Sequence, residues 1–195
     1  MDPDTFDEPK IPVDIPQEMP ADIKEKFKKL KLKLENFKKA AVKDYKKEIV
    51  GIALLPPKEK EKEKINVLVL IDDGKSEVIP DYRLKDKVAK DIIKMANSID
   101  KKIFLEIMLL SELKESFFDG KYEILQIIAM SATLYDPVEV LAALRIAEVH
   151  KTMSIKKFEH YIVSYAAAGS LFRGEKSNDI DVYVIVDDTD VKKMT

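Results

Sequence analysis

The sequence predicts an α/β protein of the α+β type, in which a small mixed sheet carries flanking helices and the whole arrangement occurs twice in tandem. Two observations lead to this prediction. Apolar runs end in paired aspartates at residues 65–73 and 180–188, and the two runs share five identities in nine positions. Each run is preceded by an apolar pair, at 49–50 and 162–163, that follows a Lys-rich helical pattern. Self-similarity of this kind is typical of a duplicated structural unit.

The first segments of the chain are an arm and a helix. Residues 1–20 are acidic and contain five prolines, which predicts an extended arm. Residues 21–47 then predict an amphipathic helix, with an apolar face made by Ile23, Phe27, Leu30, Leu34, Phe37 and Ala41. The eleven lysines of this segment could contact a nucleic-acid backbone. A solvated helix face is the favoured interpretation, because the net charge of the whole chain is only −2.

Residues 21–137 are predicted to form the first module. The run from Lys58 to Lys64 alternates in sign, which predicts an exposed hairpin loop. A helix is expected near residues 84–98 and an apolar strand at 103–109.

Residues 138–195 are predicted to form the second module. Asp136 and Pro137 predict the cap and first residue of a helix that ends near His150. This helix is expected to bury Leu141, Leu144, Ile146 and Val149. Ser154 predicts the cap of a further helix, which leads into a strand at 161–168.

Residues 168–182 carry the chemistry, because a Gly-Ser turn and a polar loop lead to two aspartates at the start of an apolar strand. Strand alternation places Asp179 and Asp181 on one face, where their charges repel unless a cation lies between them. Mg²⁺ prefers carboxylate and phosphate oxygens, so two carboxylates leave room for a nucleoside triphosphate. Two such ions could clamp both the attacking and the leaving oxygen of an in-line displacement. The stretch therefore predicts phosphoryl or nucleotidyl transfer.

The loop between the turn and the aspartates offers phosphate ligands. Gly169 lets the backbone pass close to a phosphate, and Ser170 adds an amide and a hydroxyl donor. Arg173 could bind a phosphate through two parallel hydrogen bonds. Arg173 or Lys176 could also neutralise charge that develops during the reaction.

The order of an apolar residue, Gly-Ser, a loop and Asp-apolar-Asp-apolar resembles the signature of the DNA polymerase beta-like nucleotidyltransferase superfamily. Residues 169–175 resemble its minimal archaeal and bacterial members in particular, and the resemblance covers about fifteen residues. It implies that Gly169 and Ser170 hold the triphosphate and that Asp179 and Asp181 bind Mg²⁺. The implied reaction transfers a nucleoside monophosphate to a hydroxyl group. The sequence does not identify the acceptor, which could be a protein, an RNA end or a small molecule. A homo-oligomer is also possible.

Members of that superfamily supply a third carboxylate from a later strand. This sequence ends at Thr195, fourteen residues beyond Asp181, so we expect the second module to be truncated. Because no third carboxylate is evident in the second module, activity of this chain alone is an open question, and a non-catalytic nucleotide-binding or protein/RNA interaction module is the alternative.

The first module is predicted to be degenerate. Lys64 and Asn66 occupy the positions that match Asp179 and Asp181. Glu106 resembles the third carboxylate, but one carboxylate cannot hold a metal pair. Glu106 could complete the second site if both halves shared one sheet. Strand order disfavours this, since each half should pair first with its own hairpin.

Composition limits the other possibilities. The chain has no cysteine and no apolar run of about 18 residues, which predicts neither a disulfide framework nor a membrane span. No signal peptide is visible. The high content of Lys and Glu is typical of hyperthermophile proteins and predicts a cytoplasmic archaeal protein with no membrane partner.

Overall fold

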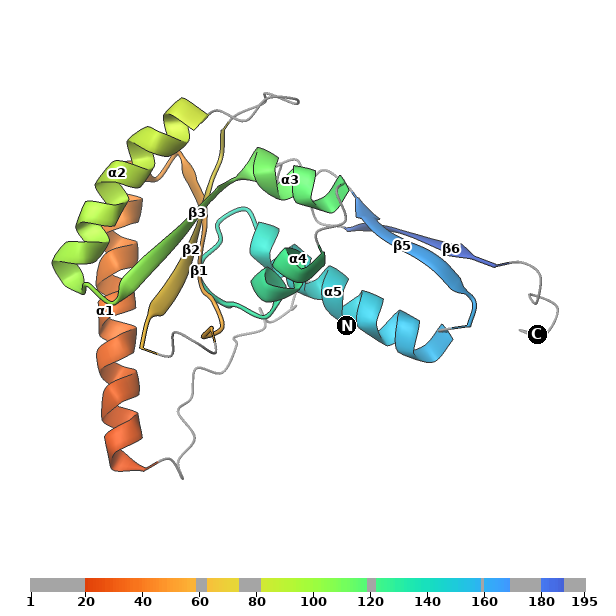
Figure 1. The fold of residues 1–195 in the computed structure, drawn as a ribbon, viewed down its shortest axis with the longest axis horizontal. Helices are drawn as coiled ribbons and strands as arrows, with labels where there is room; N and C mark the ends of the chain where they lie inside the picture. The colour runs from red at the N-terminus through yellow and green to blue at the C-terminus, as the bar shows by residue number, and fades with distance from the viewer. Residues whose placement is uncertain are drawn as a thin grey trace, which may run out of the picture.

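The computed structural model describes residues 20–58, 63–73, 82–118, 122–158, 160–168 and 180–187. Within these ranges the chain forms a four-stranded mixed sheet with helices on both faces, and a separate two-stranded sheet near the C-terminal end (Figure 1). The predicted mixture of helices and strands and the small mixed sheet with flanking helices are confirmed.

The four-stranded sheet has the order β3-β2-β1-β4. Its strands are β1 (Ile49–Leu54), β2 (Ile65–Ile71), β3 (Ile103–Leu109) and β4 (Ala132–Tyr135). β1 pairs antiparallel with β2 and β4, so β1 and β2 form the hairpin predicted around the 58–64 run. β2 and β3 are parallel, and α2 (Tyr82–Ile99) lies between them in the chain. A parallel pair needs such a crossover, which explains the helix predicted at 84–98.

Helices cover both faces of this sheet, and each face has its own core (Figure 1). On one face, α1 (Ala21–Tyr45) and α2 pack on one set of alternating strand residues. On the other face lie α3 (Leu110–Phe118), α4 (Tyr122–Ala129) and the first turns of α5 (Val140–Phe158). Because both faces are covered, β1 and β2 are almost wholly apolar rather than alternating.

Gly51 allows α5 to approach this sheet closely. A Cβ atom at Gly51 would lie 3.1 Å from Cδ1 of Leu70 and 3.3 Å from Cδ1 of Leu141, the α5 residue that packs here. Any larger residue would push these side chains apart. The start of α5 is thus packed into the core of the first sheet.

The apolar face predicted for residues 21–47 is buried only in its second half. Leu34, Phe37 and Ala41 are buried, whereas Ile23 and Phe27 are exposed. The reason is length: α1 has 25 residues, about 37 Å at 1.5 Å per residue. The strands that it covers have six or seven residues, about 20 to 23 Å. The first turns of α1 therefore extend past the sheet (Figure 1).

The prediction of two helices between Asp136 and the strand at 161–168 was wrong. A single helix, α5, continues through Ser154. Residues 150–153 contain neither glycine nor proline, so nothing interrupts the helix, and a serine is tolerated inside it. Ile146 and Val149, which were expected to be buried, are exposed, because only the first turns of α5 lie over the sheet.

The start of α5 also differs from the prediction, since Pro137 precedes the helix by three residues. A turn closes first, and Glu139 ends it with a φ of 63°. Asp136 still caps the helix, because its Oδ2 accepts a hydrogen bond from the amide of Ala142 at 2.9 Å. Burial raises the pKa of Asp136. The backbone amides of Ala142, Leu141 and Val140 act in the opposite direction, since their hydrogen bonds lower it.

A hydrogen bond between α1 and α2 supplies a pH-dependent contribution to stability. The hydroxyl of Tyr45 donates to Oδ2 of Asp91 at 2.5 Å. This bond, with burial as the second cause, raises the pKa of Tyr45 to about 12. The folded pKa thus exceeds the ordinary value of 10.0. The contribution is therefore complete below about pH 10 and is lost as the pH rises toward 12.

We expect Tyr45→Phe to lower the free energy of unfolding by about 1 kcal/mol at pH 7, because Asp91 loses its donor. The difference from wild type should shrink between pH 10 and pH 11, measured by urea denaturation. Tyr82→Phe is the matched control, since Tyr82 is exposed on α2. Equal effects of the two substitutions at pH 7 would contradict the assignment.

Candidate nucleotide and metal site

The structure places one of the six predicted site residues. Asp181 is the first residue of β6 (Asp181–Val186), and it is exposed. The other five lie outside the described residues: Gly169, Ser170, Arg173, Lys176 and Asp179. The strand begins at this aspartate because the apolar, β-branched run Val-Tyr-Val-Ile-Val follows it directly.

The backbone around Asp181 is an antiparallel hairpin. β5 (Ile162–Ala168) pairs with β6, and Ala168 lies opposite Asp181. At the other end of the hairpin, the amide of Asp187 donates to the carbonyl of Tyr161 at 2.8 Å. Asp181 is thus held at the end of the hairpin where the Gly-Ser segment connects the two strands.

A complete metal site would need ligands beyond Asp181. Among the residues that the structure describes, no group of three or more His, Cys, Asp or Glu side chains could hold a metal ion. Asp179 and Asp181 remain the residues that could hold Mg²⁺, since carboxylate oxygens are its preferred protein ligands. In the described part of the chain, β5 and β6 form a sheet without a third strand, so no later strand adds a carboxylate there.

The matching corner of the first hairpin is occupied differently. Asn66 is only 4% exposed, and its Nδ2 atom has no hydrogen-bond partner among the described residues. The ammonium group of Lys58 lies 2.5 Å from a carboxylate oxygen of Glu106, and that of Lys64 lies 4.3 Å from the centre of the Phe104 ring. A lysine ammonium group therefore lies beside Glu106, and another lies over Phe104.

Glu106 lies in β3, which belongs to the four-stranded sheet, whereas Asp181 lies in the two-stranded sheet. The described strands do not form the single merged sheet that would bring Glu106 to the second motif. This agrees with the expectation that each half pairs with its own hairpin.

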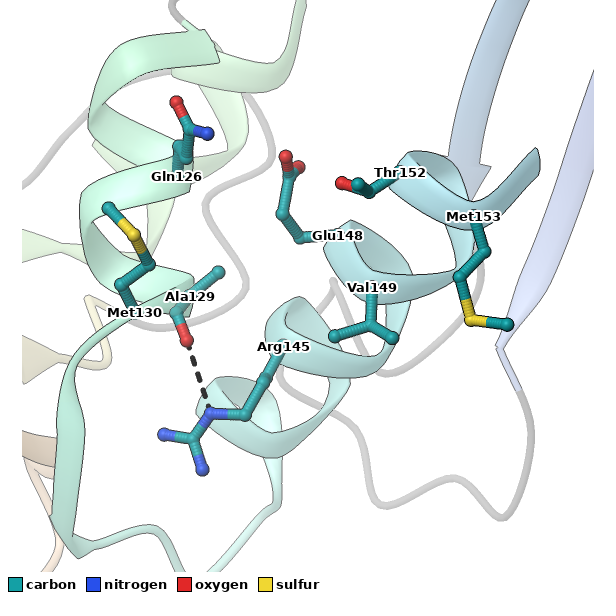
Figure 2. A pocket seen from close by; sticks show the side chains of 8 residues that line it. All are labelled: Gln126, Ala129, Met130, Arg145, Glu148, Val149, Thr152 and Met153. Carbon is teal, nitrogen blue, oxygen red and sulfur yellow. Dashed lines mark hydrogen bonds between the residues drawn. The ribbon is translucent and has the colours of Figure 1, made fainter. Parts of the chain in front are cut away.

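A groove between α4 and α5 could not be located from the sequence. It encloses about 300 Å³, and Figure 2 shows its lining: Gln126, Ala129, Met130, Arg145, Glu148, Val149, Thr152 and Met153. Arg145 could suggest a phosphate ligand. However, it donates to the carbonyls of Ala129 at 3.1 Å and Ser131 at 2.5 Å, and to the hydroxyl of Thr133 at 3.2 Å. Arg145 thus caps the end of α4, and the mainly apolar groove is unsuited to a triphosphate.

His150 contacts the second sheet. Its Nδ1 lies 2.8 Å from the hydroxyl of Tyr165 on β5, and the two rings are tilted with centroids 5.7 Å apart. Burial, and then the charge of Glu148, raise the pKa of Tyr165. The contact joins α5 to β5, which gives His150 a structural part rather than a catalytic one.

Comparison of the chain with protein-family models, with curated proteins and with solved structures found no match. Among the described helices, none has the length and apolar character needed to cross a membrane. The assignment of a function therefore depends on the motif and on its structural setting.

Proposed function

We propose that this chain carries a nucleotidyltransferase-type site, in which Mg²⁺ and a nucleoside triphosphate are held at the end of the β5–β6 hairpin. The observation that carries the proposal is the pair Asp179 and Asp181, which follows a Gly-Ser pair in the sequence, with Asp181 at the first position of β6. Two carboxylates at this spacing would lie on one side of an extended backbone and attract a divalent cation.

The geometry of the two hairpins supports a tandem duplication. Both hairpins shift their pairing register at the same place: Ile49 with Ile71 and then Gly51 with Leu70 in the first, Ile162 with Val186 and then Ser164 with Ile185 in the second. These are the residues that the repeat aligns. Bulges are specific features of a strand pair, so a shared position is more informative than shared pairing alone.

The connections between helix and hairpin also match. After α1, the amide of Glu48 donates to the carbonyl of Tyr45, and after α5 the amide of Tyr161 donates to that of Phe158. The carbonyls of Glu48 and Tyr161 each accept a bond from the aspartate that follows the second strand, at 2.7 and 2.8 Å. This correspondence supports Asn66 and Asp181 as equivalent positions, and with them a degenerate first module.

In the proposed reaction, the hydroxyl oxygen of the acceptor bonds to the α-phosphorus, and the bond from that phosphorus to the bridging oxygen breaks. Pyrophosphate leaves with the electron pair of that bond, and the proton of the acceptor hydroxyl passes to water. Asp179 and Asp181 would hold Mg²⁺, which when bound neutralises part of the triphosphate charge. Gly169 and Ser170 would bind the β and γ phosphates, and Arg173 or Lys176 would neutralise developing charge.

Calorimetric titration with each of the four ribonucleoside triphosphates, with and without Mg²⁺, tests the proposal. We expect Mg²⁺-dependent binding that is at least about tenfold weaker in an Asp179→Asn/Asp181→Asn variant, or about 1.4 kcal/mol. Asp187→Asn/Asp188→Asn is the matched control, because it removes two charges beyond the other end of β6. Equal affinity of both variants and the wild type would contradict the site.

Measuring pyrophosphate release separates the two candidate functions. Binding with release in the presence of an added acceptor supports an enzyme. Binding without release from any protein, RNA or small-molecule hydroxyl tested supports a non-catalytic nucleotide-binding module. The described residues do not provide a group of three metal ligands, which is the observation that favours this second candidate.

A further inference from the structure

A groove along the edge of the first sheet forms a second apolar surface, distinct from the proposed nucleotide site. It lies between α1 and the edge strand β4 and encloses about 200 Å³. Its apolar lining comes from three elements: Phe27, Leu30 and Leu34 of α1, Leu54 of β1, and Ala132 and Leu134 of β4. Phe27 is 37% exposed, and β4 pairs with β1 alone among the described strands. The groove therefore combines exposed apolar side chains with a free strand edge.

We propose that the N-terminal segment of this same chain occupies the groove, with Ile11, Val13 and Ile15 directed into it. Residues 1–19 lie outside the described part and connect to the groove through Pro20 and α1. The proposal rests on charge, on reach and on the residue pattern of the segment.

The segment and α1 are opposite in charge. Residues 1–20 contain six acidic side chains and one lysine, which gives a formal charge of −5. α1 contains nine lysines and four acidic side chains, which gives +5. Lys31 and Glu35 both line the groove, and Glu35 is paired with Lys38 at 2.7 Å. Lys31 forms no ion pair with the residues that the structure describes, so it is available to Asp14. Attraction of this kind favours a segment lying along α1 rather than away from it.

The length of the tether fits the position of the groove. Leu30 and Leu34 lie ten and fourteen residues beyond Pro20, about 15 to 21 Å along a helix. An extended chain that runs back from Pro20 covers this distance in about five to seven residues, at roughly 3.3 Å per residue. Counting back from Pro20 gives positions 15 to 13, where Ile15 and Val13 are apolar.

The residue pattern suits an edge position. In the sequence Ile-Pro-Val-Asp-Ile-Pro, the apolar residues 11, 13 and 15 alternate with Pro12, Asp14 and Pro16. An extended segment would direct all three apolar side chains to one side. Pro12 and Pro16 are even-numbered, whereas the apolar residues are odd-numbered. Residues 11, 13 and 15 therefore keep the backbone N–H groups that can pair with β4. Proline is tolerated in such edge strands where its position faces solvent.

Engineered cysteines test this placement directly, because the chain has none of its own. We expect Ile15→Cys with Leu134→Cys to form a disulfide under mild oxidation at least about tenfold faster than Ile15→Cys with Thr152→Cys. Thr152 is exposed on α5, beyond the turns of that helix that pack on the sheet. The rate should be independent of protein concentration and should fall at high salt, where the charges are screened.

Hydrogen exchange in the cysteine-free chain gives a second readout. The amides of β4 should lose protection in an Ile11→Ser/Val13→Ser/Ile15→Ser variant, while those of β2 stay unchanged. Equal disulfide rates for the two cysteine pairs would overturn the proposal. So would a disulfide found only between two molecules, which would assign the groove to the arm of a second copy.

Discussion

Leu70→Ala is expected to lower the free energy of unfolding by about 2 to 5 kcal/mol, the usual cost of such a truncation in a core. Ile185→Ala, its counterpart in the second hairpin, should cost less than about 1 kcal/mol. Both substitutions remove the same number of carbon atoms at positions that the repeat aligns. Leu70 is 0% exposed beneath α5, whereas Ile185 is 59% exposed. Burial, and not residue type, makes the difference.

Urea denaturation of the two variants and the wild type measures this contrast. A large cost for Ile185→Ala would contradict an exposed hairpin and would show that β6 is covered in solution. Analytical ultracentrifugation of the wild type would then tell whether a second copy covers it. A small cost for Leu70→Ala would contradict the core assigned to the first sheet.

Three strands of the first sheet were predictable because their signal is local, whereas β4 (Ala132–Tyr135) was not predicted. The apolar runs of β1, β2 and β3 are short, rich in Val, Ile and Leu, and bounded by charged or turn residues. The hairpin followed from the self-neutralising run between Lys58 and Lys64. Such features need no knowledge of distant contacts.

The helices show where local signals fail. A serine at position 154 suggested a cap, but a cap forms only where the backbone leaves the helix, and nothing in residues 150–153 makes it leave. The spacing of Ile146 and Val149 matches a buried face, yet the sheet that would bury them ends after the first turns of α5. Periodicity identifies a face and cannot say what covers it.

The candidate site was likewise predictable only in part. The motif identified Asp181 and the strand that follows it, because Asp is rare at the start of so apolar a run. The burial of Asn66 and the pairing of Lys58 with Glu106 depend on the β2–β3 crossover, which brings residues 40 positions apart onto adjacent strands. No local pattern encodes that proximity.

Asn66→Asp is expected to destabilise the first module strongly, because it would place a carboxylate at a buried position. The position is only 4% exposed, and in the described part of the chain the amide Nδ2 has no hydrogen-bond partner. A carboxylate introduced here would be desolvated, which raises its pKa by about two to three units. At about 1.4 kcal/mol per unit, the cost at pH 7 is roughly 3 to 4 kcal/mol. Asn36→Asp, at an exposed position of α1, should change the stability little.

The loss of stability caused by Asn66→Asp should increase with pH. Because the introduced carboxyl group has a folded pKa above its unfolded value of about 3.9, the penalty is absent below pH 3.9 and grows as the pH rises to the folded pKa. Denaturation at pH 4 and pH 7 should therefore show a small and a large difference from wild type. If about 10 mM Mg²⁺ removed the difference at pH 7, the carboxylate introduced at position 66 would bind a divalent cation. That result would support positions 66 and 181 as equivalent, because the binding would depend on a carboxylate that the wild-type chain lacks at position 66.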